Sequence, residues 1–333
     1  MRFNLLYRSV NKKGKENTIP TLFKTACELQ GVEFVGMDAS DLGKSFTLST
    51  LPKLGKGDLI YRSAVGGSAS IAEKMMVNDD VSSFYTTWQS VNFSRVASWF
   101  THKKFGLPVV PTFPDIPSSV EELHQVVEHL GSFPIIVKVT GGSLGVGVMR
   151  IDSMKSLQSV LDYLVATKAV AMLRKYIPHD FYVRAVVLGD AVVASHATYV
   201  AEGEFRTNVL NGNVEQRREA RVLPEDIQQI AVQAVRTLGL ETGGVDLLYD
   251  KDNKPYIAEV NFPNDFATTQ KVTSIDIAGK MLEYLVEKAK KVKSYKVHNV
   301  RCVCSATCNV FFNFITPVPK SCVTWYGACF MNL

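Results

Sequence analysis

The sequence predicts a mixed α/β protein in which a small, open parallel sheet precedes two lobes built around antiparallel hairpins. Three observations lead to this prediction. The first 90 residues alternate strand and helix patterns, and the segments 182–200 and 244–261 each have the pattern of a β-hairpin. A chain of 333 residues, with 46% hydrophobic and 21% charged side chains, is long enough to form more than one core.

The N-terminal part predicts a small parallel sheet. Its apolar runs suit buried strands, which cover residues 3–9, 33–37 and 58–63. A helix is expected between the first two strands, because Pro20 suits a first turn and Gly31 follows the last apolar residue. Strands joined through a helix favour parallel pairing, so residues 1–90 are expected to form a domain of their own.

The middle of the chain predicts a glycine-rich hairpin flanked by helices. The expected elements are a helix at 92–105, an extended piece at 109–112, a helix at 118–130, strands at 134–140 and 148–151, and a helix at 153–166. The second helix has a clear N-terminal signature, in which Ser119 is followed by Glu121 and Glu122. The two strands are joined by Gly-Gly-Ser-Leu-Gly-Val-Gly at 141–147.

The last folded part predicts two hairpins and two helices. The expected elements are a strand at 172–177, a hairpin at 182–200, a helix at 224–239, strands at 244–249 and 256–261, and a helix at 275–291. The first hairpin is expected to turn at Gly189 and Asp190.

Charge and hydropathy exclude several classes of protein. The net charge of +5 is spread along the chain, and the lysine run at 288–293 suits the C-terminal turn of a helix, so nucleic acid is not an expected partner. No segment approaches the roughly 20 apolar residues that cross a bilayer, so no membrane partner is expected. The first residues have the pattern of a strand rather than of a secretory signal, which predicts a cytoplasmic protein.

The last residues form an atypical, cysteine-rich tail, for which the predicted range is 296–333. It contains Cys302, Cys304, Cys308, Cys322 and Cys329 and almost no charge. Their spacing lacks the paired knuckles of a zinc site, so a metal role for the tail is not favoured.

The second hairpin places three oxygen-bearing side chains together. If it turns between Asp252 and Asn253, Asp246 lies directly opposite Glu259, and Asn261 falls on the same face. Two carboxylates in adjacent strands repel each other, and a divalent cation such as magnesium would remove the conflict. The alternative is an exposed edge at which both charges are solvated, but each acid lies within an apolar run.

The first hairpin of the middle part has the features of a phosphate site. Lys138 lies inside an apolar strand, where its charge needs a fixed anion. The glycine-rich turn that follows can bring backbone N–H groups close to phosphate oxygens; its candidate residues are Gly141, Gly142, Ser143 and Gly145. The turn matches neither a P-loop nor a dinucleotide fingerprint. The alternative is a surface hairpin in which the lysine reaches solvent.

Two arginines are candidates for binding an acyl phosphate or a carboxylate. Arg184 lies in a strand of the hairpin at 182–200, and Arg206 follows that hairpin in Phe-Arg-Thr-Asn. A planar, permanently charged guanidinium suits either anion. Spacing alone equally allows structural ion pairs.

The order of these motifs resembles the RimK-type branch of the ATP-grasp superfamily, which includes glutamate ligases and the aminoadipate ligases of lysine biosynthesis. The similarity covers about residues 90–290 and includes Arg-Lys-Tyr-Ile, Val-Arg-Ala-Val-Val-Leu-Gly-Asp, Phe-Arg-Thr-Asn, Gly-Val-Asp-Leu, Glu-Val-Asn and Ser-Ile-Asp-Ile-Ala-Gly-Lys. It implies a pre-ATP-grasp domain at 1–90 and an ATP-grasp domain at 91–295. The latter has a small lobe at 91–173 and a large lobe at 174–295, with the nucleotide between them.

The resemblance also implies roles for individual residues. For the nucleotide, it implies that Lys138 and Arg95 bind phosphates and that Lys175, Tyr176 and Ile177 hold adenine. It also implies that Arg206, Thr207 and Asn208 face the γ and acyl phosphates, and that Arg184 lies on the substrate side. Two magnesium or manganese ions are expected to bind to Asp246, Glu259 and Asn261. Of these, Arg184, Arg206 and Asn208 are the expected catalytic residues.

The sequence departs from the family pattern at three places. Lys175 stands where an acid usually accepts the adenine amino group, and Tyr182 stands where an acid usually binds ribose. The small-Ser-Pro-Gly turn after the last metal ligand is replaced by Phe-Pro-Asn-Asp at 262–265. This last change concerns the acceptor side of the site.

The resemblance therefore implies an ADP-forming carboxylate–amine ligase that acts through an acyl phosphate. Its expected partners are ATP, a carboxylate and an amine, with an amino acid such as glutamate added to a small-molecule or protein acceptor. The alternative is a non-catalytic ATP-binding scaffold of the same fold. The sequence does not determine the oligomeric state, and a homo-oligomer remains one of the expected forms.

Overall fold

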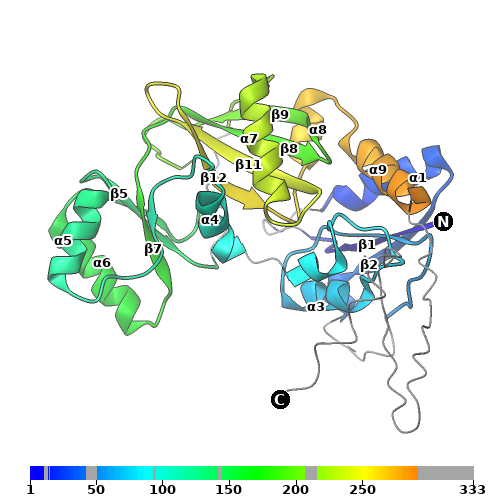
Figure 1. Cartoon of the computed structure of the whole chain (residues 1–333), viewed down its shortest axis with the longest axis horizontal. Helices are drawn as coiled ribbons and strands as arrows, with labels where there is room; N and C mark the ends of the chain where they lie inside the picture. Colours follow the sequence, from blue (N-terminus) through cyan, green and yellow to red (C-terminus); the bar gives the residue numbers. More distant parts are fainter. Residues whose placement is uncertain are drawn as a thin grey trace, which may run out of the picture. The chain divides into compact units, whose positions relative to one another are not determined.

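A computed structural model describes residues 1–10, 14, 16–42, 51–92, 95–141, 145–206 and 216–291, without the side chains of residues 42 and 95–97. Residues Met1–Ala289 form one compact unit. Its described strands form three sheets, each described below (Figure 1). The predicted tail at 296–333 lies outside the described residues.

The N-terminal sheet is parallel, as predicted. Its strands β1 (Arg2–Tyr7), β2 (Glu33–Asp38) and β3 (Leu59–Arg62) lie in the order β2-β1-β3. The helices of this part are α1 (Ile19–Gln30), α2 (Ala39–Leu42) and α3 (Gly67–Met76). Helix α1 ends at Gly31, whose φ of 65° is the left-handed conformation that glycine adopts at little cost. Helix α3 had not been predicted.

The four-stranded sheet is antiparallel and has its own core. Its strands are β4 (Thr112–Phe113), β5 (Ile135–Val139), β6 (Val148–Ile151) and β7 (Ala171–Lys175), in the order β4-β7-β5-β6. Helices α5 (Val120–His129) and α6 (Met154–Ala166) pack against it through apolar side chains (Figure 1). The predicted N-cap of α5 is confirmed, because Ser119 Oγ accepts a hydrogen bond from Glu122 N at 3.1 Å.

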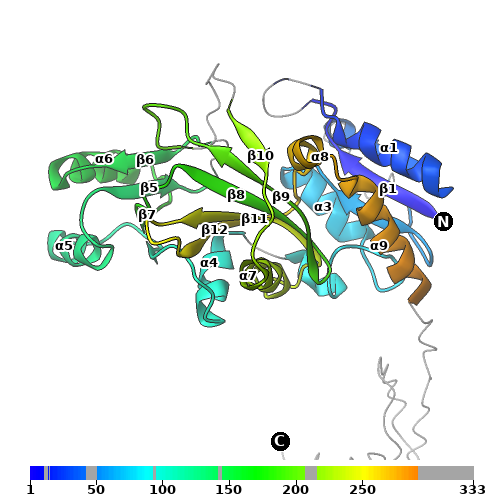
Figure 2. The same cartoon turned by 90° about the horizontal axis from the view of Figure 1, so that it is seen from above.

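The five-stranded sheet carries both predicted hairpins. Its strands are β8 (Phe181–Leu188), β9 (Ala191–Tyr199), β10 (Arg218–Ala220), β11 (Thr242–Tyr249) and β12 (Pro255–Asn261), in the order β10-β9-β8-β11-β12. The remaining helices are η2 (Trp88–Asn92), α4 (Arg95–Lys104), α7 (Glu225–Arg236), α8 (Ala267–Thr273) and α9 (Ile277–Lys291). Helix α7 covers one face of the sheet, and α8 packs on β9 and β10 (Figure 2).

The N-terminal sheet and the five-stranded sheet share one hydrophobic core. Phe23 of α1 packs edge-on against Phe266, with ring centroids 5.6 Å apart, and Tyr61 of β3 packs against Phe262 at 6.2 Å. Helix α9 is joined to α1, because Gln30 Nε2 donates to the carbonyl of Gly279 at 2.9 Å. The predicted domain boundaries at residues 90, 173 and 295 stay predictions.

The hairpin of β11 and β12 has the predicted register only in the part away from its turn. Asp246 pairs with Glu259, as predicted, but Leu247 pairs with Ile257, so the register shifts by one residue between them. The predicted turn between Asp252 and Asn253 is wrong, because the hairpin closes by pairing Asp250 with Lys254, and Asn253 has a φ of 58°. A β-bulge compensates for the displaced turn.

Candidate active site

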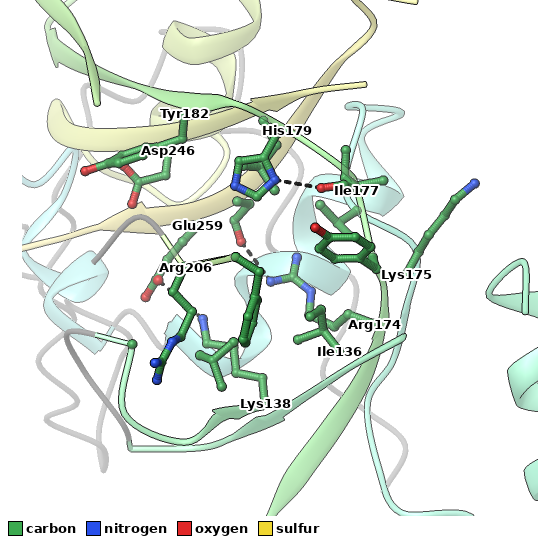
Figure 3. A pocket seen from close by; sticks show the side chains of 17 residues that line it. Ile136, Lys138, Arg174, Lys175, Ile177, His179, Tyr182, Arg206, Asp246 and Glu259 are labelled. Atoms are coloured by element: carbon green, nitrogen blue, oxygen red, sulfur yellow. Dashed lines mark hydrogen bonds and ion pairs between the residues drawn. The ribbon is translucent and has the colours of Figure 1, made fainter. Parts of the chain in front are cut away.

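A cavity of about 200 Å³ lies between the four-stranded and the five-stranded sheets (Figure 3). The first sheet contributes strands β5, β6 and β7, and the second contributes β8, β11 and β12. The cavity is lined by Val110, Ile136, Lys138, Gly145, Val148, Arg174, Lys175, Tyr176, Ile177, His179, Tyr182, Phe205, Arg206, Asp246, Leu248, Ala258 and Glu259. Most of the predicted site residues that the structure describes therefore meet at one place.

The predicted acidic cluster is assembled on the cavity side of the sheet. Asp246 of β11 faces Glu259 of β12, and Asn261 Nδ2 donates to Asp246 Oδ2 at 3.0 Å. The side chain of Asp246 is 13% exposed and that of Glu259 is 36% exposed. Asp246 is therefore not at an exposed, fully solvated edge, which was the alternative that the sequence left open.

Each acid of the cluster already has a basic partner. The guanidinium of Arg184 lies opposite Asp246 and binds both of its carboxylate oxygens, with Nη2 at 3.0 Å from Oδ2. Lys138 Nζ lies 3.3 Å from Glu259 Oε2. Burial raises the pKa of Asp246, and the charge of Arg184 opposes that rise. The repulsion predicted from sequence is thus offset by two ion pairs.

The glycine-rich hairpin is described only at its two ends. Gly141, Gly145 and Gly147 all have positive φ, and Val139 N donates to the carbonyl of Gly147 at 2.8 Å, which closes the hairpin beside Lys138. Gly145 lines the cavity. Gly142 and Ser143 lie outside the described residues.

The predicted adenine segment passes along the cavity wall. Ile177 is buried, and its carbonyl accepts a hydrogen bond from His179 Nδ1 at 2.6 Å. Arg150 stacks over the ring of Tyr176, with its Cζ 5.0 Å from the ring centroid. The side chain of Lys175 is exposed and extends away from the cavity (Figure 3). Only the backbone of Lys175 therefore remains on the cavity side.

The two candidate arginines both form ion pairs. Arg184 binds Asp246, and Arg206 lines the cavity while pairing with Glu204, with its Nη2 2.8 Å from Oε2. The hydrogen bonds from Arg206 lower the pKa of Glu204 to about 2. Thr207, Asn208 and the side chain of Arg95 lie outside the described part of the chain.

The cavity is also lined by Tyr182, whose contact with ribose stays a prediction, and by Arg174 and His179, which were not predicted as site residues. Tyr182 is 6% exposed and lines the cavity on β8. Arg174 lies on the predicted strand at 172–177, next to Lys175, but the two side chains point in opposite directions (Figure 3). Side chains alternate between the two faces of a strand, so this alternation could have predicted that Arg174 points into the cavity.

The turn after Asn261 is held by the N-terminal sheet. Tyr61 Oη donates to the carbonyl of Asn264 at 3.0 Å and accepts from Asn264 N at 3.1 Å. Asn264 is 1% exposed, and its side chain packs on Gly244, where an added Cβ would collide with Oδ1. The altered turn at 262–265 is thus held in place by the N-terminal sheet.

Comparison with known proteins identifies the class to which this fold and site belong. The RimK-like ATP-grasp domain matches residues 106–285, which is more than half of the chain. The chain therefore belongs to the RimK-like ATP-grasp family. It is an ATP-dependent ligase that joins a carboxylate to an amine and forms ADP, and catalysis is favoured over a binding scaffold.

Named relatives and solved structures agree with this family. The chain is 29% identical over 248 residues to the probable alpha-L-glutamate ligase 1 of Shewanella denitrificans, covering 74% of this chain and 80% of that one. It is 28% identical over 249 residues to the probable alpha-L-glutamate ligase of Coxiella burnetii, covering 74% and 79%.

Two solved structures share the fold. The ATP-grasp ligase PsnB complexed with a minimal precursor has a TM-score of 0.67 at 15% identity, covering 86% of this chain and 99% of that one. The D-alanine–D-alanine ligase from Bacillus anthracis complexed with ATP has a TM-score of 0.62 at 15% identity, covering 88% and 97%. The predicted two-lobed fold is confirmed. No helix in the described ranges is both long and apolar enough to cross a membrane.

Proposed function

We propose that the protein adds an amino acid such as glutamate to the carboxylate of a small molecule or of a peptide or protein terminus. The observation that carries this proposal is the single cavity that brings Lys138, Arg206 and the acidic pair together. Its relatives are named glutamate ligases, and one solved neighbour, the macrocyclase MdnC, is bound with a precursor peptide. These names support both the amino acid and the two kinds of acceptor.

In this proposal, the nucleotide lies along the cavity from the adenine segment to the acidic pair. Tyr176, Ile177 and the backbone of Lys175 hold the adenine, and Tyr182 lies beside the ribose. Lys138, Arg95 and the backbone of Gly141, Gly142, Ser143 and Gly145 bind the phosphates. Arg206, Thr207 and Asn208 face the γ phosphate, and Arg184 lies on the substrate side.

The acidic cluster is the proposed site for two magnesium ions, with manganese as a substitute. Two carboxylates and an amide oxygen are hard donors of the kind that magnesium selects, so the residues present fit the ion. Bound magnesium would offset the negative charge on the transferring phosphoryl group. Because Lys138 Nζ contacts Glu259 Oε2, ATP would draw this ammonium from the carboxylate toward its phosphates.

In the proposed reaction, an oxygen of the substrate carboxylate attacks the γ phosphorus, and ADP leaves with the bonding electrons. The amine then attacks the acyl carbon, and inorganic phosphate leaves as the amide forms. Arg184 and Arg206 would stabilise the negative oxygen of the tetrahedral intermediate. No side chain is assigned as a general base.

The proposal is tested with a panel of carboxylates and amines scored for ADP release in the presence of magnesium. Glutamate as the amine, with a peptide or small carboxylate as the acceptor, is expected to give the fastest release. Firm ATP binding without ADP formation from any pair would instead favour a scaffold.

Mass spectrometry of a cell extract incubated with the protein and ATP would identify the acceptor. The expected result is one species that gains the mass of an amino acid residue. The same extract with Asp246→Asn protein is the control, and a gain in mass in that control would show that another enzyme is responsible.

A further inference from the structure

The β-bulge in β12 determines that the two acids face each other. Asp246 faces Glu259, and Leu247 faces Ile257, so Ala258 is the additional residue. With an uninterrupted register from Leu247 onward, Glu259 would lie opposite Val245, which is fully buried in the core beneath α7. A one-residue slip turns every following side chain to the other face of the sheet. The bulge therefore brings Glu259 to the cavity.

The backbone groups at the bulge are bound by segments outside the five-stranded sheet. Ile257 N donates to the carbonyl of Pro108 at 2.7 Å, and Val110 N donates to the carbonyl of Ile257 at 3.4 Å. The carbonyl of the additional residue, Ala258, accepts a hydrogen bond from Arg174 Nη1 at 3.2 Å. A bulged carbonyl has lost its ladder partner, so it needs another donor.

Arg174 is fixed in the orientation that this contact requires. It lies on β7 of the four-stranded sheet, and its Nε donates to Thr112 Oγ1 at 3.0 Å. Thr112 Oγ1 in turn donates to the carbonyl of Val110 at 2.8 Å. Burial lowers the pKa of Arg174 to about 10, and the charge of Glu259 opposes this fall. The guanidinium stays charged at neutral pH and lines the cavity.

We propose that Arg174 is a positioning residue that holds the bulged carbonyl of Ala258 and thereby keeps Glu259 facing Asp246. Because Arg174 precedes the adenine segment on β7, it connects the wall that receives the nucleotide to the pair that receives the metal. This inference rests on the proposed role of Asp246 and Glu259 as magnesium ligands.

The test measures ADP binding by calorimetry, with magnesium and with a chelator, in the full chain. The quantity of interest is the factor by which magnesium increases the affinity for ADP. Arg174→Met is expected to reduce this factor about 10- to 100-fold, as loss of an outer partner of a metal ligand does. The affinity for ADP alone should stay at the wild-type value. Arg174→Lys keeps a charged donor and should restore most of the factor.

Three other results would overturn the inference. A fall in ADP affinity without magnesium, at an unchanged factor, would make Arg174 a direct nucleotide contact. An unchanged factor with a lower melting temperature would make its role purely structural. An unchanged factor and unchanged stability would leave Arg174 without the role.

Three further variants make the outcome decisive. If Arg174→Met does not fold, Thr112→Val keeps the guanidinium but removes the hydroxyl that orients it, and it should lower the same factor. Arg236→Gln, on α7 away from the cavity, is the matched control. Asp246→Asn separates the proposed metal site from the proposed role of Arg174. If Asp246→Asn keeps the wild-type factor, the assignment of the metal ligands is wrong. If Asp246→Asn loses the factor and the Arg174 and Thr112 variants keep it, only the role of Arg174 is wrong.

Discussion

Lys138 Nζ and Glu259 Oε2 lie 3.3 Å apart, and this ion pair joins strand β5 of the four-stranded sheet to strand β12 of the five-stranded sheet. Both side chains are partly exposed, at 28% and 36%. The same ammonium is the proposed partner of the nucleotide phosphates, and the same carboxylate is the proposed ligand of magnesium. Binding of magnesium and ATP must therefore exchange one ion pair for two new contacts.

Glu259→Gln should separate these two contacts. The variant frees Lys138, so the affinity for ADP in the presence of a chelator should rise by between about 1.5- and 5-fold, which corresponds to the usual strength of a partly exposed ion pair. The increase in affinity on adding magnesium should be lost. Calorimetry with ADP measures both effects, and a weaker affinity in the chelator would contradict the competition between carboxylate and phosphate.

Asp246→Asn should abolish ATP-dependent turnover. The change removes a proposed metal ligand and leaves Arg184 without its carboxylate partner. Because loss of an outer partner of a metal ligand alone costs about 10- to 100-fold, the loss of turnover should exceed about 100-fold. ADP release with magnesium measures it, and circular dichroism checks the fold. Turnover near the wild-type rate would exclude Asp246 as a metal ligand.

Tyr61→Phe should weaken both stability and acceptor binding. The hydroxyl is the partner of the N–H and the carbonyl of Asn264, and its removal leaves both groups buried without that partner. The cost in unfolding free energy should be about 1–3 kcal/mol. Urea unfolding measures this cost, and steady-state kinetics should show a raised KM for the acceptor at an unchanged KM for ATP. An unchanged KM for both substrates would show that the contact between Tyr61 and Asn264 does not affect substrate binding.

Lys175→Ala should leave nucleotide binding nearly unchanged. The side chain is exposed and extends away from the cavity, so its loss should change the affinity for ATP by no more than about twofold. Tyr176→Ala is the comparison, because that side chain lines the cavity and should lower the affinity. A large loss in Lys175→Ala would show that the lysine turns inward to meet the adenine.

His196 should make the stability of the protein depend on pH between about 4 and 6.5. It is 3% exposed, and burial, with the nearby charges of Arg184 and Arg218, lowers its pKa to about 4. Between these values the unfolded chain binds the proton and the folded chain does not, so stability falls as the pH falls. From pH 7 to pH 5 this group should remove about 2 kcal/mol.

Urea unfolding of His196→Gln at both pH values checks this expectation. The difference between pH 7 and pH 5 should be smaller in the variant than in the wild type. His124→Gln, in which an exposed histidine of α5 is changed, should keep the wild-type difference. An equal pH dependence in the wild type and in His196→Gln would show that other groups cause it.

Local patterns predicted those parts of the site that adjacent strands determine. Asp246 and Glu259 belong to one hairpin, so counting along two strands sufficed to place them together. The count succeeded although the turn was displaced, because the bulge at Ala258 restored the register. A bulge depends on tertiary partners such as Arg174 and Pro108, and the sequence pattern of β12 alone does not predict it.

Contacts between distant segments could not be predicted in this way. Arg184 and Asp246 pair across β8 and β11, which are not consecutive in the chain, so the sequence left the role of Arg184 open. Tyr61 reaches Asn264 across 203 residues. Such pairings follow from the way the sheets pack and from the order of their strands.

The shared core of the N-terminal and five-stranded sheets has a practical consequence for work on this family member. The segment that matches the family, 106–285, leaves out the residues that the N-terminal sheet contributes to this shared core. A fragment cut to that segment would lose the ring partners of Phe262 and Phe266, namely Tyr61 and Phe23, and would expose that aromatic surface to water. Boundaries for expression, crystallisation or domain exchange should therefore follow the aromatic contacts and keep the N-terminal sheet with the five-stranded sheet.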